Sequence, residues 1–461
     1  MRTQPSPSRA RPKPPRPTAR PLLAACLALG LLACDEGSGL SPRGSSGPPA
    51  SDAGGGAWQG QDGSTGAVDA SVGAMDAAVG ATDGAVQGPD ASTGGSSPDA
   101  GTGGSNAGGT DDVYGTAIAR DGSYWVDGAR LMHGGTELEL RGVNWFGLET
   151  TERALHGLWS GRKVADFLAQ VQSLGFTALR IPVSRDSIRP GYASASWANH
   201  DGVDTGREQL EELLGAADAA GLRVLLDIHT CDSAISGGFS GSPEACSGYT
   251  LDDWKSDLAT LATLAKSHAS VVGIDLFNEP HNATWSRWRE LVAMGARAVL
   301  GANPRILVFV EGVGDLSDAG GYAPFWGENL VAALTAPVDV PRSRLVFAPH
   351  VYGPSVYRQP YFSDASFPTN MTGVWDAHFG HVRNAGYPVA IGEFGGRYDT
   401  AGSPSDRAWQ EALVAYLRTR GIRHSFYWCL NPNSGDTGGI LLDDWKTADA
   451  GKVDLLHRLW Q

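Results

Sequence analysis

The chain has 461 residues and a formal net charge of −14, with 50 acidic and 36 basic side chains. This length allows two or three domains of ordinary size, so composition has to show how much of it folds. Acidic residues outnumber basic ones from Val113 to Gln461 as well. Because an acidic domain repels phosphate, nucleic acid is excluded as a partner, and a neutral or diffusible substrate is favoured.

The amino terminus has the pattern of an export signal. Every charged side chain between residues 2 and 20 is basic, and an apolar run, Leu22–Ala33, follows. The run is too short to span a bilayer, so residues 1–33 are a predicted secretory signal. The letters LLAC resemble a bacterial lipobox, which predicts an exported protein held at the cell envelope or surface only through a lipidated Cys34. An ordinary signal with an incidental cysteine, and release to the extracellular space, is the alternative.

Residues 34–112 form a low-complexity stretch of Gly, Ala, Ser, Pro and Asp with almost no large apolar side chains. Such a stretch cannot bury enough surface to offset its chain entropy, so we interpret it as a linker. One folded domain, residues 113–461, then remains, and we expect it to be monomeric.

The cysteines outside the signal suggest one disulfide. Cys231 and Cys246 flank a loop rich in Gly and Ser, and a disulfide between them is plausible in an exported protein. A metal-binding pair is the weaker alternative. Cys429 lies in an aromatic strand and is interpreted as a buried thiol.

Short apolar runs typical of buried strands recur along the domain, after a hairpin expected around Ser123–Thr136. Eight such runs are found: Leu138–Phe146, Ala178–Val183, Arg223–His229, Val271–Phe277, Ile306–Val310, Leu345–Val351, Val389–Phe394 and Ser425–Leu430.

Amphipathic helical patterns separate most of these strands. They read KVADFLAQVQSLG, REQLEELLGAADAAG, DDWKSDLATLATLAKSH, TWSRWRELVAMGARAVL, TGVWDAHFGHVRNAG and DRAWQEALVAYLRTRG. Between the fifth and sixth strands only a short helix, Glu328–Leu334, is expected. Eight strands joined by crossovers predict a parallel (β/α)8 TIM barrel in the α/β class. A doubly wound open sheet is disfavoured because no Gly-rich phosphate loop follows the first strand.

In such a barrel the chemistry sits at the carboxyl ends of the strands. Polar and aromatic residues are dense at these ends: Asn144, Trp145, Arg180, His229, Asn278, Glu279, Glu311, His350, Tyr352, Glu393 and Trp428. Each one alone has a structural explanation, but their joint appearance indicates a site.

Two carboxylates stand out among them. Glu279 ends the fourth strand and Glu393 the seventh, so a closed barrel places them across the mouth from each other. Paired carboxylates serve glycosidic bond cleavage, in which one acid protonates the leaving oxygen and the other attacks or activates water. The two must then differ in protonation state.

The motifs GVNWFG, HGLW, LRIPVS, LLDIHT, DLFNEPH, FVEG, APHVYGPSVY, IGEFG and YWCLNPNSGDTGGILLDDW occur in this order. Their order and spacing resemble the family 5 glycoside hydrolases, especially the bacterial cellulase branch, over residues 138–447. The resemblance implies a retaining endo-β-1,4-glucanase that acts on cellulose or related β-glucans without a metal or organic cofactor.

The resemblance also implies roles for the matching residues. Glu279, in NEP, would be the general acid and base, and Glu393, in GEFG, the nucleophile. Arg180 and Tyr352 would contact the nucleophile and keep it charged. Asn278 would donate to the 2-hydroxyl of the sugar.

Further residues of the same motifs would bind the substrate. His229 and His350 resemble the pocket histidines that contact sugar hydroxyls, and Asn144 is grouped with them. Trp428 resembles the platform under the sugar at the cleavage site, and its bond to Cys429 is expected to be cis.

Several other aromatic and acidic residues could belong either to the site or to the structural core. Trp159, in HGLW, matches a substrate-lining loop. Four others line subsites or belong to the core: Trp145, Trp326, Trp375 and Tyr357. The helical residues Trp254, Trp288 and Trp409 are interpreted as packing. Glu149 and Glu311 are rival carboxylates, with Glu311 expected to make a supporting hydrogen bond, and Asp227 and Asp275 are expected to pair structurally.

Two alternatives remain for the function. The same mechanism could act on mannan, xyloglucan or mixed-linkage glucan, because loops rather than the catalytic residues set specificity. A non-catalytic surface carbohydrate-binding protein is the alternative from another class. The presence of both Glu279 and Glu393 argues against it.

Overall fold

The computed structural model describes residues 108–233, 241–315, 319–398 and 404–461. The predicted signal, the lipobox with Cys34 and nearly all of the predicted linker lie outside these residues. The first strand, β1, begins at Thr110, just before the predicted domain boundary.

The core is a parallel barrel, as predicted. Its strands follow the order β11-β10-β9-β8-β7-β6-β14-β13-β12, and every pairing within it is parallel. The strands are β6 (Arg141–Asn144), β7 (Ala178–Ser184), β8 (Arg223–Thr230), β9 (Val271–Asp275), β10 (Leu307–Val310), β11 (Leu345–Phe347), β12 (His350–Tyr352), β13 (Ala390–Gly395) and β14 (His424–Tyr427). β11 and β12 are two parts of the predicted sixth strand, so together they count as one of the eight strands of the barrel. A bridge from Phe347 to Val389 helps to close the ring.

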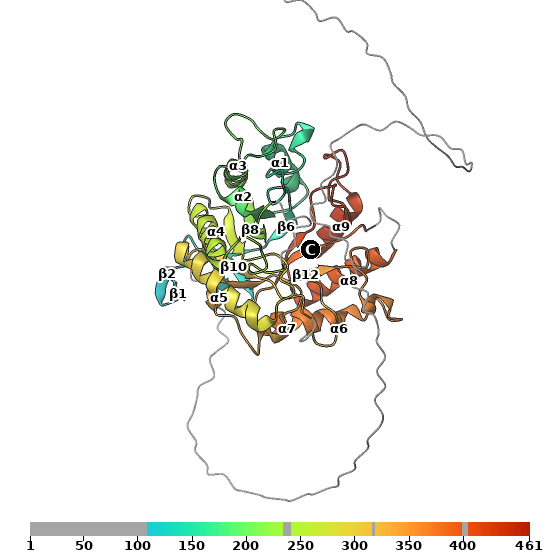
Figure 1. Cartoon of the computed structure of the whole chain (residues 1–461). Helices are drawn as coiled ribbons and strands as arrows, with labels where there is room; N and C mark the ends of the chain where they lie inside the picture. The colour runs from blue at the N-terminus through green and yellow to red at the C-terminus, as the bar shows by residue number, and fades with distance from the viewer. Residues whose placement is uncertain (1–107, 234–240, 316–318, 399–403) are drawn as a thin grey trace, which may run out of the picture. The chain divides into compact units, whose positions relative to one another are not determined.

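Helices surround the strands on the outside (Figure 1). They are α1 (Val164–Ser173), α2 (Arg185–Ile188), α3 (Gly206–Ala220), α4 (Leu251–Leu264), α5 (Trp285–Ala302), α6 (Met371–Trp375), α7 (His381–Asn384), α8 (Pro404–Arg420) and α9 (Ala450–Trp460). A π-helical segment, Asp376–Gly380, joins α6 to α7 within the predicted helix. Between β10 and β11 the predicted short helix is a single 3-10 turn, Val331–Ala333.

Two small antiparallel sheets precede the barrel. They contain β1 (Thr110–Val113) with β2 (Thr116–Ala119), and β3 (Tyr124–Asp127) with β4 (Arg130–His133) and β5 (Thr136–Leu138). The predicted hairpin is therefore part of a three-stranded sheet.

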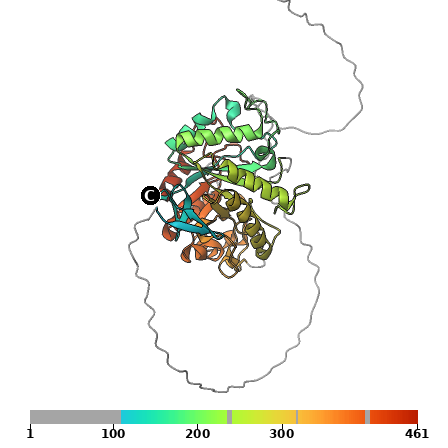
Figure 2. The same cartoon turned by 90° about the vertical axis from the view of Figure 1, so that its left-hand side faces the viewer.

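These sheets contact the residues that lead into the barrel strands, and Figure 2 turns them toward the viewer. The Tyr124 hydroxyl donates to the carbonyl of Ala269, just before β9, at 2.6 Å. Arg344, just before β11, is buried and pairs with Asp111 at 2.8 Å. The amino ends of these strands are thus covered, while the opposite end is where a barrel of this class builds its site.

The buried tryptophans resolve several open expectations. Trp254, Trp288 and Trp409 are fully buried on helices, as expected for packing. Trp145 and Trp375 belong to the main hydrophobic core and are therefore interpreted as packing residues.

The cysteine expectations are confirmed. Cys231 and Cys246 form a disulfide, and Cys429 is a buried free thiol. The metal-binding alternative for Cys231 and Cys246 is therefore excluded.

Candidate active site

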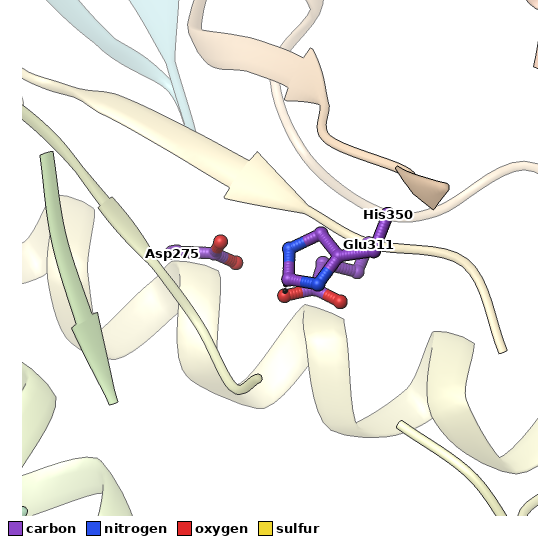
Figure 3. Close-up of side chains that lie close together, drawn as sticks. All are labelled: Asp275, Glu311 and His350. Atoms are coloured by element: carbon purple, nitrogen blue, oxygen red, sulfur yellow. Dashed lines mark ion pairs between the residues drawn. The ribbon is translucent and has the colours of Figure 1, made fainter. Parts of the chain in front are cut away.

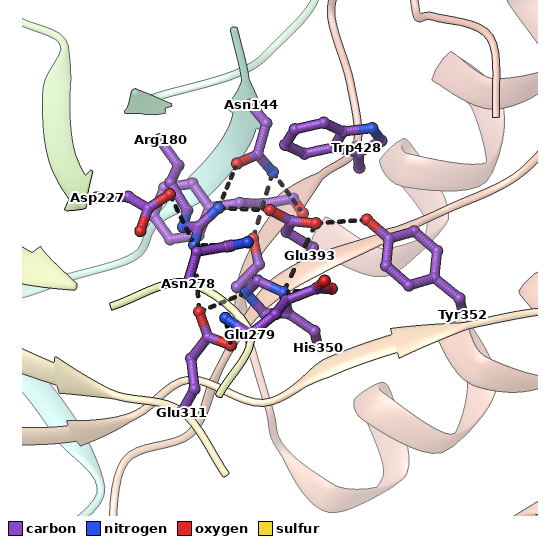
Figure 4. A network of polar contacts seen from close by, with 12 residues as sticks. Asn144, Arg180, Asp227, Asn278, Glu279, Glu311, His350, Tyr352, Glu393 and Trp428 are labelled. Carbon is purple, nitrogen blue, oxygen red and sulfur yellow. Dashed lines mark hydrogen bonds and ion pairs between the residues drawn. The ribbon is translucent and has the colours of Figure 1, made fainter. Parts of the chain in front are cut away.

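The strand register brings the predicted residues together at the carboxyl end of the barrel (Figure 4). Asn144 on β6 pairs in register with Arg180 on β7, and His350 on β12 pairs with Glu393 on β13. Because neighbouring parallel strands are about 4.8 Å apart, residues in the same register lie side by side. Glu279 follows β9 and completes the cluster.

Glu393 is held by two donors. Arg180 Nη1 lies 2.6 Å from its Oε1, and the Tyr352 hydroxyl donates to its Oε2 at 2.5 Å. Burial raises the pKa of Glu393, but the positive charge of Arg180 and the hydrogen bond from Tyr352 oppose that rise. Both donors therefore favour the ionised carboxylate.

Glu279 has a different environment. Its exposed fraction is 7%, and its Oε1 lies 3.2 Å from Nδ1 of His350. Burial raises the pKa of Glu279 well above its ordinary range, and the negative charge of Glu393 raises it further. An oxygen of Glu279, an oxygen of Glu393 and a ring nitrogen of His350 all lie within 4.8 Å of one another. The environment therefore favours the ionised form more at Glu393 than at Glu279.

Arg180 links the site to a group of buried acids. Its Nη2 lies 3.1 Å from both Asp227 and Asp275 and 3.3 Å from Glu311. Burial alone would lower the pKa of Arg180, but the neighbouring negative charges raise it well above its ordinary value. Burial raises the pKa of Asp227 and of Asp275 to about 7. The expected structural pairing of these two aspartates is present, with Arg180 as the partner.

Both pocket histidines are neutral at physiological pH. Burial lowers the pKa of His229 to about 3, and it lowers the pKa of His350 well below its ordinary value. Nδ1 of His229 lies 2.7 Å from Asp227. This contact orients the His229 ring, which stacks on Trp428 at a centroid distance of 5.7 Å.

Asn278 has a donor available for a ligand. Its Oδ1 accepts from Arg180 at 3.0 Å, whereas its buried Nδ2 has no hydrogen-bond partner within the described part of the chain. An unsatisfied buried amide is costly, so this position suits a residue that donates to a bound molecule.

Asn144 is packed beside Arg180 beneath the site. Its side chain is fully buried, its Oδ1 accepts from Arg180 at 3.2 Å, and its Nδ2 is 3.3 Å from the carbonyl of Gly392. Through these contacts Asn144 helps to hold the guanidinium of Arg180 in place. Sequence reasoning grouped Asn144 with the substrate-binding residues because a strand end alone does not show which way a side chain faces.

A row of rings leads outward from the site. Trp428, whose bond to Cys429 is cis as expected, stacks on Phe146 with centroids 5.7 Å apart. His156 contacts Phe146 at 5.0 Å, and Trp159 contacts His156 at 5.1 Å. Trp159 is 37% exposed, which leaves ring surface free for a ligand.

Trp159 is braced by two tryptophans to which the sequence motifs gave no role, although Trp445 is the last residue of the longest motif. Trp197 and Trp445 meet its ring in perpendicular contacts at 4.9 and 5.1 Å. They come from distant loops, so no local pattern could have predicted these contacts. Trp326 and Tyr357 are half-buried, and Trp326 stacks on His281 at 3.8 Å.

The rival carboxylates are both buried. Glu149 accepts from the Gly147 N–H at 2.8 Å, and burial raises its pKa to about 8. Glu311 lies beside Arg180 and His350 and accepts from the Glu279 N–H at 2.9 Å, in agreement with its expected supporting role.

Two groups of potential metal ligands occur among the described residues. One is Asp275, Glu311 and His350 (Figure 3), and the other is Glu279, His350 and Glu393. Their oxygens already contact Arg180, the Glu279 N–H or a ring nitrogen. We therefore interpret both groups as parts of one hydrogen-bonded network.

Comparison with known proteins identifies the family. The family model described as Cellulase (glycosyl hydrolase family 5) matches residues 135–434. The major extracellular endoglucanase of Xanthomonas campestris pv. campestris is 41% identical over 356 residues, which cover 73% of this chain and 71% of that protein. An endoglucanase of Paenibacillus polymyxa is 37% identical over 368 residues, covering 76% of this chain and 90% of that protein.

Solved structures agree with these matches. The catalytic domain of the Xanthomonas enzyme is 40% identical, with a TM-score of 0.68 and coverage of 73% of this chain and 99% of that one. An endocellulase from Pyrococcus horikoshii, solved in complex with cellotetraose, is 36% identical, with a TM-score of 0.69 and coverage of 74% and 98%. The chain therefore belongs to glycosyl hydrolase family 5.

The coupling of the two carboxylates can be measured without substrate. We expect Glu393→Gln to lower the pKa of Glu279, because it removes a negative charge that disfavours ionisation of Glu279. NMR titration of the carboxyl carbons measures this. Glu244→Gln, which changes a surface carboxylate paired with Arg287, is the control and should leave the pKa of Glu279 unchanged. An equal pKa of Glu279 in the wild type and in Glu393→Gln would contradict the coupling.

Proposed function

We propose that the chain is a retaining endo-acting glycoside hydrolase with Glu279 as general acid and base and Glu393 as nucleophile. It cleaves internal β-1,4-glucosidic bonds of cellulose or related β-glucans by double displacement. The observation that carries the role assignment is the close pair of carboxylates in unlike environments, with oxygens within 4.8 Å of each other. Carboxyl groups about 5 to 5.5 Å apart leave no room for a water between the base and the sugar, as retention requires.

The first half-reaction forms a glycosyl-enzyme intermediate. A carboxylate oxygen of Glu393 attacks the anomeric carbon while the bond from that carbon to the glycosidic oxygen breaks. Glu279 gives its proton to the departing oxygen, so the leaving chain departs as a neutral alcohol. The raised pKa of Glu279 keeps that proton in place until it is needed.

The second half-reaction returns the enzyme to its starting state. Glu279, now ionised, takes a proton from a water molecule, whose oxygen attacks the anomeric carbon. The ester bond to Glu393 breaks, and Glu393 leaves as a carboxylate stabilised by Arg180 and Tyr352. Two inversions at the same carbon give net retention.

The remaining polar groups position the sugar and the nucleophile. The unpartnered Nδ2 of Asn278 suits a hydrogen bond to the 2-hydroxyl, a contact that strengthens in the transition state. Of the two pocket histidines, His229 is the one proposed to contact a sugar hydroxyl. His350 is fully buried and both of its ring nitrogens face the carboxyls of Glu279 and Glu311, so its expected contact with the sugar is replaced by contacts with these acids. Trp428 lies beside Glu393 (Figure 4) and is proposed as the aromatic wall next to the sugar at the cleavage point, although only 2% of its surface is exposed.

The two assignments can be separated by mutation. Glu393→Ala should abolish hydrolysis of carboxymethyl-cellulose, because no group remains to form the covalent intermediate. Glu279→Ala should lower activity on the same polymer by about 10² to 10⁴-fold, the contribution of a positioned acid. Reducing-sugar release measures both, and unchanged thermal melting shows that the fold is retained. Wild-type turnover in either variant would refute its role.

The exposed ring of Trp159, which is joined to Trp428 through the buried rings of Phe146 and His156, supports binding of an extended β-glucan chain. The names of the relatives, which are endoglucanases, agree with such a substrate. The exposed face of Trp159 lies at the outer end of this row and would contact a sugar some distance from the cleaved bond.

Trp159→Ala should therefore raise KM for long cello-oligosaccharides by about tenfold, which corresponds to ~1.4 kcal/mol of lost binding. The KM for cellotriose should change much less, because a short substrate does not need to reach Trp159. Leu334→Ala is the control, because Leu334 directly follows the 3-10 turn Val331–Ala333 and its side chain is about as exposed as that of Trp159. Equal changes for short and long substrates would show that Trp159 is not a distal platform.

We further propose that the protein is exported and held at the cell envelope by lipidation of Cys34. The Xanthomonas relative is named an extracellular enzyme, which supports export. Across the described residues, none of the helices has the length and apolarity needed to cross a bilayer.

Cys34→Ala should remove the lipid and release the protein from the membrane fraction. Labelling with a fatty-acid analogue, followed by fractionation, measures this. Cys429→Ala, which changes a buried thiol, should leave labelling intact. Unaltered membrane association of Cys34→Ala would rule out the lipid anchor.

A further inference from the structure

Glu311 is a third buried carboxylate at the centre of the site, and the double displacement does not use it. It directly follows β10, and its side chain is fully shielded from solvent. Figure 4 shows it beside Glu279 and His350, on the side away from Tyr352.

Glu311 contacts three parts of the machinery at once. Its Oε2 accepts from the main-chain N–H of Glu279 at 2.9 Å. Its Oε1 lies 3.1 Å from Nε2 of His350, whose other ring nitrogen faces the Glu279 carboxyl, and 3.3 Å from Nη2 of Arg180. One carboxylate therefore touches both the backbone of the acid and the ring beside its side chain.

The backbone of Glu279 needs such support. Its φ is +48°, in the left-handed region that side-chain-bearing residues other than Asn and Asp rarely adopt. Strained conformations of this kind persist only where the surroundings hold them. The hydrogen bond from the Glu279 N–H to Glu311 fixes the peptide that enters this conformation, and so sets the direction in which the carboxyl points.

The surroundings are shaped to admit the Glu311 carboxylate. A Cβ atom on Gly327 would lie 2.1 Å from Oε2 of Glu311, so any larger residue there would displace the carboxylate. Gly327 also has a φ of +73°. On the other side, Nε1 of Trp288 donates to the main-chain carbonyl of Glu311 at 2.9 Å and anchors its backbone.

We propose that Glu311 is a positioning residue that aims the Glu279 carboxyl at the glycosidic oxygen. The proposal rests on the proposed role of Glu279 as the acid. The nucleophile should be much less affected, because Arg180 keeps Asp227 and Asp275 as partners and Glu393 keeps Tyr352. Loss of Glu311 should therefore impair protonation of the leaving group more than attack on the sugar.

This prediction is tested with two substrates that differ in their need for an acid. Dinitrophenyl β-cellobioside releases a stable phenolate and needs little protonation, whereas cellopentaose releases an alcohol and needs a proton. The ratio kcat/KM is the quantity to compare, because it covers the steps up to formation of the intermediate and excludes its later hydrolysis.

Glu311→Leu should lower kcat/KM on cellopentaose at least ~10-fold more than on the aryl substrate, as a fraction of what a positioned acid contributes. KM should change little, because Glu311 is buried beneath the substrate surface. Glu311→Gln, which keeps one acceptor for the Glu279 N–H, should restore part of the loss.

Two further variants separate positioning from folding. Gly327→Ala leaves Glu311 chemically intact but displaces its carboxylate, so the same selective loss on cellopentaose is expected. Glu328→Gln is the matched control, because Glu328 is also buried and accepts a backbone N–H, that of Phe325, at 2.7 Å. Its effect should be equal on both substrates.

Equal losses on the two substrates for Glu311→Leu would overturn the proposal and leave Glu311 a purely structural residue. The absence of any loss would overturn it as well. Glu279→Ala, assayed on the same two substrates, separately tests the assignment of Glu279 as the acid. If Glu279→Ala also loses equally on both, the assignment of Glu279 as the acid fails, rather than the role of Glu311.

Discussion

The buried guanidinium of Arg180 is the interaction on which the site depends. A charge in the interior is tolerated only where partners replace the lost water, and Arg180 has Asp227, Asp275 and Glu393 within 3.1 Å. These partners stand on different strands, so a parallel barrel is needed to bring them around one side chain. The acids are in turn kept at the site by the cation that they surround.

Arg180 acts unequally on the pKa values of the two central carboxyls, Glu279 and Glu393. Both are buried, and burial raises the pKa of each. Arg180 donates directly to Glu393, however, whereas Glu279 faces the neutral ring of His350. One carboxyl can therefore serve as an acid while the other stays charged, without any difference in residue type.

Much of the fold could be predicted because each element has a local pattern. The eight apolar runs match the strands of the barrel. Glycines such as Gly175 and Gly221 stand just after helices, where the backbone has a positive φ. The direction of individual side chains could not be predicted in this way. Trp145 and Trp159 are both aromatic residues that follow β6, yet Trp145 is fully buried and Trp159 is 37% exposed.

By itself, the sequence determined the class of fold and the two acids that stand at strand ends, because periodicity and motif order are local properties of the chain. Only the tertiary structure decided how charge and protons are shared among them. It brought Glu311 under the backbone of Glu279, placed Asn144 behind Arg180, and joined Trp197 and Trp445 to Trp159. These contacts join residues far apart in the chain, and a pKa depends on the distances that closure of the barrel creates.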